Sequence, residues 1–456
     1  MKNPDRQIMS VSDLQQTKRL KANLRGKVIL PGDPEYDSNR MVWNGMINRH
    51  PALIAQCAGP GDVVQALRYA RELNLEIAVR GGGHGVPGYA TVDNGLVIDL
   101  SLMKGLVIDA QQQTALASSG LRLGEFIQSI QAHGLLTTVG TDPDTGLSGL
   151  TLGGGIGSLM GKFGLTCDNV RSFEMVTAAG EVVHANAAEN PDLYWGLRGG
   201  GGNFGIVTNF EFQLHQASNV LGGIITHPIS RAREVLQFYR DFLHQIPDEL
   251  TVFSTLNNDS EGHPSVGFLV CYVGDLNAGE HVIEPLRKFG PPLVDLVQPM
   301  PYFDFLGWGH LPRGLRYYGK GGTLPELSDE VIDRLIEAAL SKTSPLSQIL
   351  IQHIHGVAAR VAPDATAFSA RGDCFIPFIL SVWEGDSDQA HADWARKTWT
   401  SLEPFSSEAG YINFLGMEGQ ERVKSAYGGN YTRLAQLKQH YDPENIFKLN
   451  TNILPG

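Results

Sequence analysis

The hydrophobic pattern of the first third of the chain alternates between helix-like and strand-like segments. After the turn 59–62, whose last residue suits a helix N-cap, apolar residues recur at the spacing of one helix face at Val63, Ala66, Leu67 and Ala70. The apolar segments 75–79 and 96–100 are typical of buried strands, and a second helical face follows at Leu123, Phe126, Ile127 and Ile130. This order predicts a strand-helix-strand unit that leads into the turn after residue 79.

The pattern changes in the middle of the chain. In segment 209–214 apolar and polar residues alternate strictly, which predicts a strand. From about Gly222 glycine becomes rarer, strand-like and helical segments alternate, and helices are expected near 232–243 and 329–340. The change predicts a second domain.

Length and charge narrow the function classes. A chain of 456 residues is too long for one ordinary core, so two or three domains are expected. The net charge is -12 and no block of five or six like charges occurs, which argues against nucleic acid as a partner.

Three features bear on compartment. Cys57, Cys167, Cys271 and Cys374 are widely spaced without a CxxC pair, so we expect buried reduced thiols and neither a zinc site nor disulfides. Residues 1–18 are polar and lack the apolar core of a signal peptide. No run of 18 apolar residues occurs, so no membrane span is expected. The sequence therefore predicts a soluble, cytoplasmic protein.

Glycine is the unusual component. Glycine accounts for 53 of the 456 residues, a larger share than the average usage of about 7%. The glycines cluster at 81–88, 146–164 and 196–205. Glycine runs let backbone amides approach a ligand such as a pyrophosphate, because no Cβ intervenes. His84 lies inside the first run, where spacing alone is equally compatible with an ordinary turn histidine.

Two other motifs have competing interpretations. The run 200–205 matches GxGxxG, but a period-2 strand follows it where a dinucleotide-binding Rossmann fold needs a helix, so we reject that interpretation. His353 and His355 alternate as on one strand face, but no third ligand is nearby, so we expect cavity-lining or hydrogen-bonded histidines and no metal site.

Four motifs, in order, carry a resemblance to a known family. The segments are RGGGH at 80–84, GLTLGGG at 149–155, ENPDLYWGLRGGGGNFG at 189–205 and YDPENIF at 441–447. In this combination the chain resembles the berberine-bridge-enzyme-like branch of the vanillyl-alcohol-oxidase-type FAD oxidases. The resemblance is dense over 80–215 and 411–456.

The resemblance implies an α+β fold. A two-part PCMH-type FAD-binding domain would span 1–215, and a substrate domain with a central antiparallel sheet covered by helices would span 216–410. The segment 411–456 would return to the FAD domain. It further implies FAD bound covalently through His84 to its 8α-methyl carbon, with cofactor contacts from Arg80, Gly81, Gly82, Gly83, His84, Gly85, Gly88, Gly140, Asp142, Thr145, Gly146, Gly149, Gly153, Gly154, Gly155, Gly157, Gly205, Ile206, Val207, Tyr411, Asn450 and Asn452.

Two positions depart from the family pattern. Asp142 stands where doubly attached members carry a second flavin-linking cysteine, so a single covalent bond is expected. In one interpretation its charge slows oxygen reduction by repelling a developing anion. In the other it is a turn residue before Pro143 that faces solvent. Asn413 stands where the berberine bridge enzyme has its catalytic glutamate, which argues against alkaloid ring closure.

The implied activity is oxidation. We expect hydride transfer from a C–H next to a hydroxyl or amine of a small substrate, such as a sugar or natural-product intermediate, to flavin N5 and then to O₂, which gives H₂O₂. A dehydrogenase with poor oxygen reactivity and a non-catalytic flavin-binding module are the alternatives. The sequence does not predict the substrate or the oligomeric state.

The resemblance also places Tyr427 over the flavin, beside Asn413. We expect Tyr427 to take the substrate proton, for which its phenolate would need a stabilising cation. Arg316 and Arg371 are the candidate cations.

Overall fold

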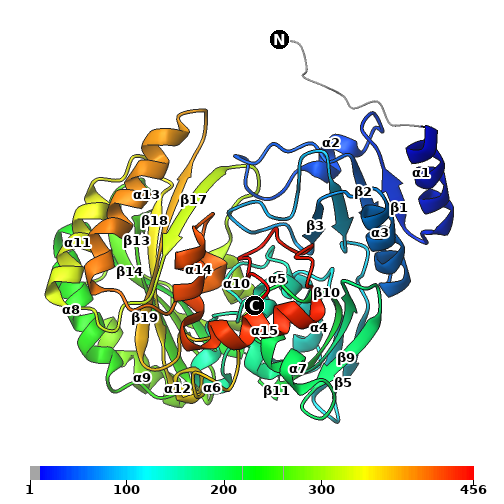
Figure 1. Cartoon of the computed structure of the whole chain (residues 1–456). Coiled ribbons are helices and arrows are strands. Elements are labelled where there is room, and N and C mark those ends of the chain that lie inside the picture. Colours follow the sequence, from blue (N-terminus) through cyan, green and yellow to red (C-terminus); the bar gives the residue numbers. More distant parts are fainter. Residues whose placement is uncertain (1–10, 218, 260) are drawn as a thin grey trace.

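The computed structural model describes residues 11–217, 219–259 and 261–456, and three large sheets dominate this part of the chain (Figure 1). The eight-stranded sheet and its helices form one lobe, and the four-stranded and five-stranded sheets form the other. The predicted α+β architecture is confirmed. Residues 1–10, the start of the polar leader, lie outside the described residues.

The four-stranded sheet contains the strand that delivers the first glycine run. Its spatial order is β1 (Lys27–Ile29), β2 (Leu53–Gln56), β4 (Leu96–Asp99) and β3 (Ile77–Arg80), with β2 and β3 parallel to β4. The crossover between β2 and β3 is α3 (Pro60–Glu72), on which α1 (Val11–Asn23) packs. The strand-helix-strand prediction is therefore confirmed.

The five-stranded sheet is antiparallel and carries the remaining glycine loops. Its order is β5 (Leu106–Asp109), β6 (Thr114–Ser118), β10 (Gly205–Gln213), β8 (Val170–Thr177) and β9 (Val182–Asn186). Because the strand β10 follows the GxGxxG run directly, the rejection of a Rossmann site is confirmed. The elements around this sheet are α4 (Leu123–Gln131), β7 (Leu135–Leu136), α5 (Leu147–Leu152), α6 (Met160–Phe163), η1 (Thr166–Asn169), α7 (Pro191–Leu197) and β11 (His215–Gln216).

The eight-stranded sheet is antiparallel. Its order is β15 (Val294–Asp295), β12 (Asn219–Pro228), β14 (Pro264–Tyr272), β13 (Leu250–Asn258), β18 (Gln348–Ile354), β19 (Cys374–Trp383) and β17 (Arg316–Gly321), with β16 (Gln298–Pro301) also paired to β12. All these strands fall inside the predicted 216–410 range, although the boundaries themselves stay a prediction.

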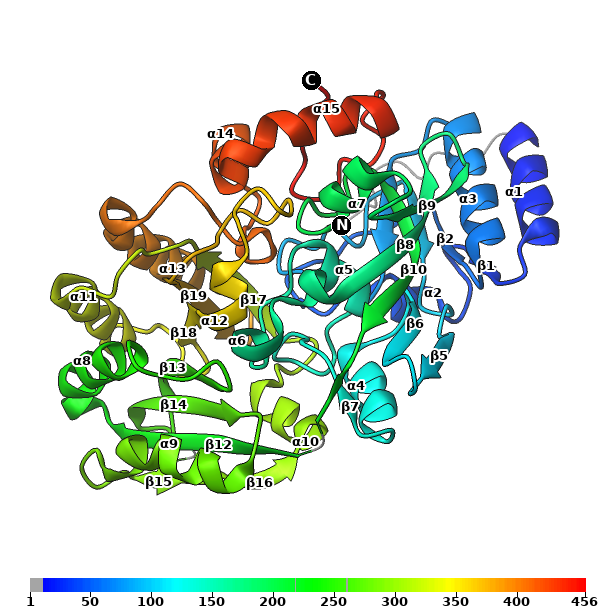
Figure 2. The ribbon, with the colours of Figure 1, turned by 90° about the horizontal axis from the view of Figure 1, so that it is seen from below.

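Four long helices cover one face of this sheet. They are α8 (Ala232–Leu243), α9 (Leu276–Lys288), α11 (Asp329–Leu340) and α13 (Asp388–Leu402), and all lie on the outer side in Figures 1 and 2. The helix α11 begins at its predicted position because Ser328 Oγ accepts a hydrogen bond from Val331 N at 3.3 Å. Val252 and Ile351 point to the helices, so their strand neighbours face the other lobe.

The C-terminal segment returns to the first lobe. The helix α15 (Tyr431–Tyr441), which is red in Figure 1, packs on α7. Its Lys438 side chain is fully buried and donates to Asp442 at 2.7 Å and to the Asn203 carbonyl at 2.9 Å. The other short elements are α2 (Tyr36–Arg40), η2 (Ile229–Arg231), α10 (Tyr302–Leu306), η3 (Gly307–Gly309), α12 (Gly356–Arg360), η4 (Glu403–Phe405), η5 (Ile412–Phe414), α14 (Gln420–Tyr427) and η6 (Gly428–Asn430).

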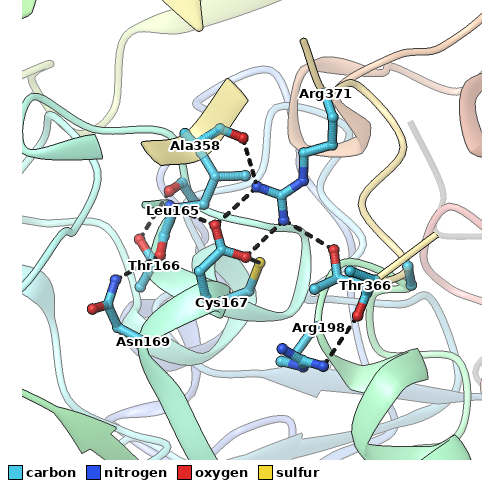
Figure 3. Close-up of polar contacts among 12 residues, drawn as sticks. Leu165, Thr166, Cys167, Asn169, Arg198, Ala358, Thr366 and Arg371 are labelled. Atoms are coloured by element: carbon cyan, nitrogen blue, oxygen red, sulfur yellow. Dashed lines mark hydrogen bonds and ion pairs between the residues drawn. The ribbon is translucent and has the colours of Figure 1, made fainter. Parts of the chain in front are cut away.

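A buried ion pair joins the two lobes (Figure 3). The Arg371 side chain is completely buried and donates to both carboxylate oxygens of Asp168, at 2.7 and 2.8 Å. It also donates to Thr366 Oγ1 at 2.9 Å and to the Ala358 carbonyl at 3.1 Å. These bonds fix the loop after α12 against η1.

The four cysteines are all free and buried, as the sequence predicts. No helix within the described residues is both long and apolar enough to cross a lipid bilayer.

Candidate functional site

A cavity of about 530 Å³ lies where the lobes meet. Glycine loops from the first lobe form one side, and the uncovered face of the eight-stranded sheet forms the other. The C-terminal segment adds residues 411–415, 447 and 449–451. Segments far apart in the sequence therefore share one site.

The glycine loops pack directly backbone to backbone. A Cβ on Gly82 would lie 2.4 Å from Gly146 N, and a Cβ on Gly146 would lie 2.3 Å from Gly82 N. Gly83 has φ +68°, a conformation that favours glycine. Larger residues would separate the loops, so the sequence requires glycine here to form the cradle.

His84 ends this cradle with its ring held in an aromatic stack. The ring lies 4.1 Å from the Trp43 ring, which in turn lies 3.7 Å from the Tyr317 ring. The His84 side chain is 14% exposed, and its Nε2 atom is 3.2 Å from Asp142 Oδ2. This contact is an ion pair when the imidazole is protonated.

Asp142 is buried, so the interpretation of this residue as a turn residue that faces solvent is wrong. It is 5% exposed and accepts hydrogen bonds from Asp144 N at 2.8 Å and Leu311 N at 2.9 Å. Burial acts to raise the pKa of this carboxyl, but His84 and the two backbone donors outweigh it and lower the pKa below its usual value. Asp142 therefore stays ionised at neutral pH and holds the loop that contains Leu311 beside His84.

Most of the predicted cofactor residues line the cavity. These are Gly81, Gly82, Gly83, His84, Gly85, Gly140, Asp142, Thr145, Gly146, Gly149, Gly205, Ile206, Val207, Tyr411 and Asn450. Asn450 donates to the Gly202 carbonyl at 3.2 Å, which fixes one glycine loop.

Seven predicted cofactor residues lie outside the lining: Arg80, Gly88, Gly153, Gly154, Gly155, Gly157 and Asn452. Arg80 instead forms a buried ion pair with Asp99 at 2.7 Å. The run 153–157 serves close packing, since a Cβ on Gly157 would lie 1.6 Å from the Val139 carbonyl oxygen. The structure places these seven residues behind the cavity lining, and their contact with the cofactor stays a prediction.

Tyr427 also lies outside the cavity lining, and its catalytic role stays a prediction. The side chain is 1% exposed and its hydroxyl donates to the Gly200 carbonyl at 3.1 Å. Burial raises the pKa of Tyr427 well above its usual value. Neither candidate cation serves it, because Arg316 pairs with Asp388 and Arg371 pairs with Asp168.

Tyr411 and Asn413 are polar side chains that residues 411–415 bring to the cavity. Asn413 Nδ2 donates to Tyr411 Oη at 2.9 Å, and Ile156 N donates to the same oxygen at 3.3 Å. Burial raises the pKa of Tyr411 to about 12, although these donors act in the opposite direction. The phenol is therefore protonated at neutral pH.

The two histidines of β18 and its end are hydrogen-bonded, as one of the alternatives predicts. Their rings stack at 5.3 Å, His353 Nε2 contacts Asp373 at 2.7 Å, and His355 Nε2 contacts Thr251 Oγ1 at 3.1 Å. Neither lines the cavity. Within the described ranges no group of three or more His, Cys, Asp or Glu side chains is arranged to hold a metal ion.

Sequence reasoning missed several site residues. Trp43 stacks on His84, Tyr317 stacks on Trp43, and the backbone N–H of Leu311 donates to Asp142, but none of these three residues lies in a sequence motif. The polar residues on the uncovered sheet face were also missed. Only the period-2 pattern of these strands could have indicated them, because alternate residues share a face.

The residues present fit FAD. The cradle offers glycine backbone to a pyrophosphate, and Ile206, Val207 and Phe447 offer apolar surface to an aromatic ring.

Comparisons with known proteins agree with this site. Residues 51–186 match the family model described as FAD binding domain, and residues 410–454 match the one described as berberine and berberine like. The uncharacterized FAD-linked oxidoreductase YgaK of Bacillus subtilis is 31% identical over 95% of this chain and 98% of its own. The (R)-6-hydroxynicotine oxidase of Paenarthrobacter nicotinovorans is 31% identical over 95% and 97%.

Solved structures give the same result. The 6-hydroxy-D-nicotine oxidase of Arthrobacter nicotinovorans is 30% identical, with a TM-score of 0.87 over 95% of this chain and 98% of its own. The BBE-like 1 protein of Physcomitrella patens has a TM-score of 0.88 at 22% identity, over 96% and 98%, which shows a shared fold. The chain therefore belongs to the berberine-bridge-enzyme-like family of FAD-linked oxidoreductases, and it is an FAD-dependent enzyme.

Proposed function

We propose that the protein is an oxidase whose FAD is covalently held by His84 alone. It removes a hydride from a C–H next to an amine or hydroxyl of a small molecule and produces H₂O₂. The observation that carries this proposal is the shared cavity, in which His84, the glycine cradle and an uncovered sheet face lie together. When bound, FAD supplies the hydride acceptor and the reaction with O₂.

The protein groups divide the remaining work. Trp43 and Asp142 hold His84 for attachment, and Tyr411 offers a protonated hydroxyl to the cavity. A phenol with a pKa of about 12 is a poor base at neutral pH. An amine fits this arrangement better than an alcohol, because hydride loss next to nitrogen leaves an iminium ion and requires no protein base. The similarity to a 6-hydroxynicotine oxidase supports the amine.

The first experiment tests attachment and turnover separately. The purified protein should carry flavin fluorescence that stays with the polypeptide in a denaturing gel. A screen of amines and alcohols that follows peroxide should identify substrates, and mixing the anaerobically reduced protein with air should reoxidise the flavin rapidly. Slow reoxidation would instead establish a dehydrogenase.

Tyr411→Phe should slow anaerobic flavin reduction by about tenfold, the value of one hydrogen bond of ~1.4 kcal/mol. Because the phenol stays protonated, the pH profile of reduction between about pH 6 and 10 should keep its inflections. Tyr427→Phe is the matched control and should leave reduction unchanged, since Tyr427 bonds only Gly200. A larger loss in the control than in Tyr411→Phe would return the role to Tyr427.

Asp142→Asn should slow covalent attachment severalfold, because the amide keeps the size of the side chain but not the charge that faces His84. Attachment is measured as gel-retained flavin at timed intervals after FAD is added to flavin-free protein. The matched control is Asp144→Asn, whose carboxylate pairs with Arg122 and is 40% exposed. Because the Asp142 pKa is lowered by folding, its contribution to stability is present above about pH 4 and is lost in stronger acid. Equal attachment rates in both variants would contradict a positioning role.

A further inference from the structure

The uncovered face of the eight-stranded sheet forms the floor of the cavity. The floor residues come from β12, β13, β14, β18 and β19, and cross-strand register places them in rows. In one row Thr226 is opposite Gly267, Gly267 opposite Thr255, Thr255 opposite Leu350, and Leu350 opposite Phe378. Gly267 adds no side chain between the two threonines, and a Cβ there would lie 3.0 Å from Thr226 Cγ2.

The floor is polar but uncharged. Its polar members are Thr226, Thr255, Asn257, Gln348 and Gln352, and its apolar members are Ile224, Leu269, Leu350, Phe378 and Leu380. None of these described side chains is ionisable. An ion bound there would lose its hydration without a countercharge, at a cost of several kcal/mol. The floor therefore selects against charged ligands.

Two floor residues carry buried polar atoms without a hydrogen-bond partner. Gln352 is 2% exposed, and its Oε1 atom has no hydrogen-bond partner. Thr226 is 9% exposed, and its Oγ1 atom has no hydrogen-bond partner either. An unsatisfied buried polar atom is costly, so such atoms in a cavity indicate a ligand that completes them. β12 and β18 are three strands apart at ~4.8 Å per strand, and Gln352 is two residues along β18 from Leu350, which lies in the row of Thr226. Thr226 and Gln352 are therefore about 16 Å apart.

We propose that the floor binds an uncharged, elongated, largely apolar ring compound with hydrogen-bonding groups at both ends. One end donates to Gln352 Oε1 and the other bonds Thr226 Oγ1. An amine substrate binds as its free base. Oligosaccharides fit poorly, because the aliphatic and phenyl members of the floor would leave several sugar hydroxyls without partners. This inference rests on the proposed function only in that the reacting C–H is presented in the same cavity.

The test uses four size-matched probes with the flavin-loaded wild-type protein at pH 7. They are 4,4′-biphenol, which is neutral, the anion 4′-hydroxybiphenyl-4-carboxylate, the cation 4-(4-hydroxyphenyl)benzylammonium, and cellobiose. Titration calorimetry should give a Kd for the biphenol at least tenfold lower than for the other three. Equal binding of any charged probe or of cellobiose, or no binding of the biphenol, overturns the proposal.

Variants then locate the binding. Gln352→Glu should weaken binding of the biphenol at least tenfold and strengthen binding of the cation, because it adds a negative charge while keeping the size of the side chain. Gln112→Glu, in an exposed turn, is the matched control and should change neither.

A second variant guards against misfolding of the first. Thr226→Val removes a hydroxyl that has no partner, so it should keep or raise the unfolding midpoint while weakening the biphenol about fivefold. A lower midpoint with unchanged binding overturns the assignment of Thr226. If biphenol binding responds as expected but no peroxide is formed with any amine or alcohol, the floor stands and the oxidase proposal fails. If peroxide is formed but charged probes bind as tightly as the biphenol, the oxidase proposal stands and the floor proposal fails.

Discussion

His84→Ala should purify with no flavin attached to the polypeptide. His84 is the cavity residue at the end of the glycine cradle, and its ring is held between Trp43 and Asp142. Asp142 occupies the position at which a second attachment would need a cysteine, and all four cysteines are buried outside the cavity lining. Under the proposed attachment, removal of the imidazole removes the covalent anchor entirely.

The variant should nevertheless bind FAD reversibly. The loops of Gly82 and Gly146 and the apolar surface of Ile206 do not depend on the imidazole. Acid precipitation should thus release all flavin from His84→Ala and none from wild type. Each supernatant is measured by fluorescence.

A matched control separates this effect from general damage to the loop. His310 also approaches Asp142, with Nδ1 3.6 Å from Oδ1, but its side chain is 44% exposed. His310→Ala should therefore retain gel-bound flavin. Gel-bound flavin in His84→Ala, or acid-released flavin from wild type, would refute attachment at His84.

The cradle could be predicted because its requirement is local. Two loops can touch through their backbones only where both carry glycine, so Gly82 and Gly146 are visible in the sequence as part of glycine runs. The same requirement also predicts ligand contact for the glycine run 153–157, which lies outside the cavity lining. Gly157 is required just as strictly, but by the carbonyl of Val139 and not by a ligand. A glycine run indicates close approach and does not say what approaches.

The positions of the side chains could not be predicted in the same way. The stack of His84, Trp43 and Tyr317 joins three segments that meet only when the lobes are assembled. Tyr427 and Tyr411 are both tyrosines of the C-terminal segment, and only the packing decides which reaches the cavity. Tyr411 is placed there by the bond from Asn413, whereas Tyr427 is turned to the Gly200 carbonyl.

Arg371→Met should destabilise the protein by about 3–5 kcal/mol, the usual result when one partner of a buried ion pair is removed. The Arg371 side chain is completely buried and lies outside the cavity lining, and the Asp168 side chain is 11% exposed. Without Arg371, the Asp168 carboxylate would therefore be buried without its charge partner. It would keep only local bonds, such as the one from Leu165 N at 2.8 Å. Urea unfolding followed by fluorescence measures the loss.

The double variant Arg371→Met/Asp168→Asn tests the physical reason. If the cost comes from the unpaired charge, neutralising Asp168 should recover part of the stability lost in Arg371→Met, although a further side chain has been changed. Arg360→Met is the matched control, because Arg360 pairs with Asp248 at the surface and should leave the unfolding midpoint unchanged. Additive losses in the double variant would show that the guanidinium stabilises the lobe junction through its bonds to Thr366 and Ala358, and not through its charge.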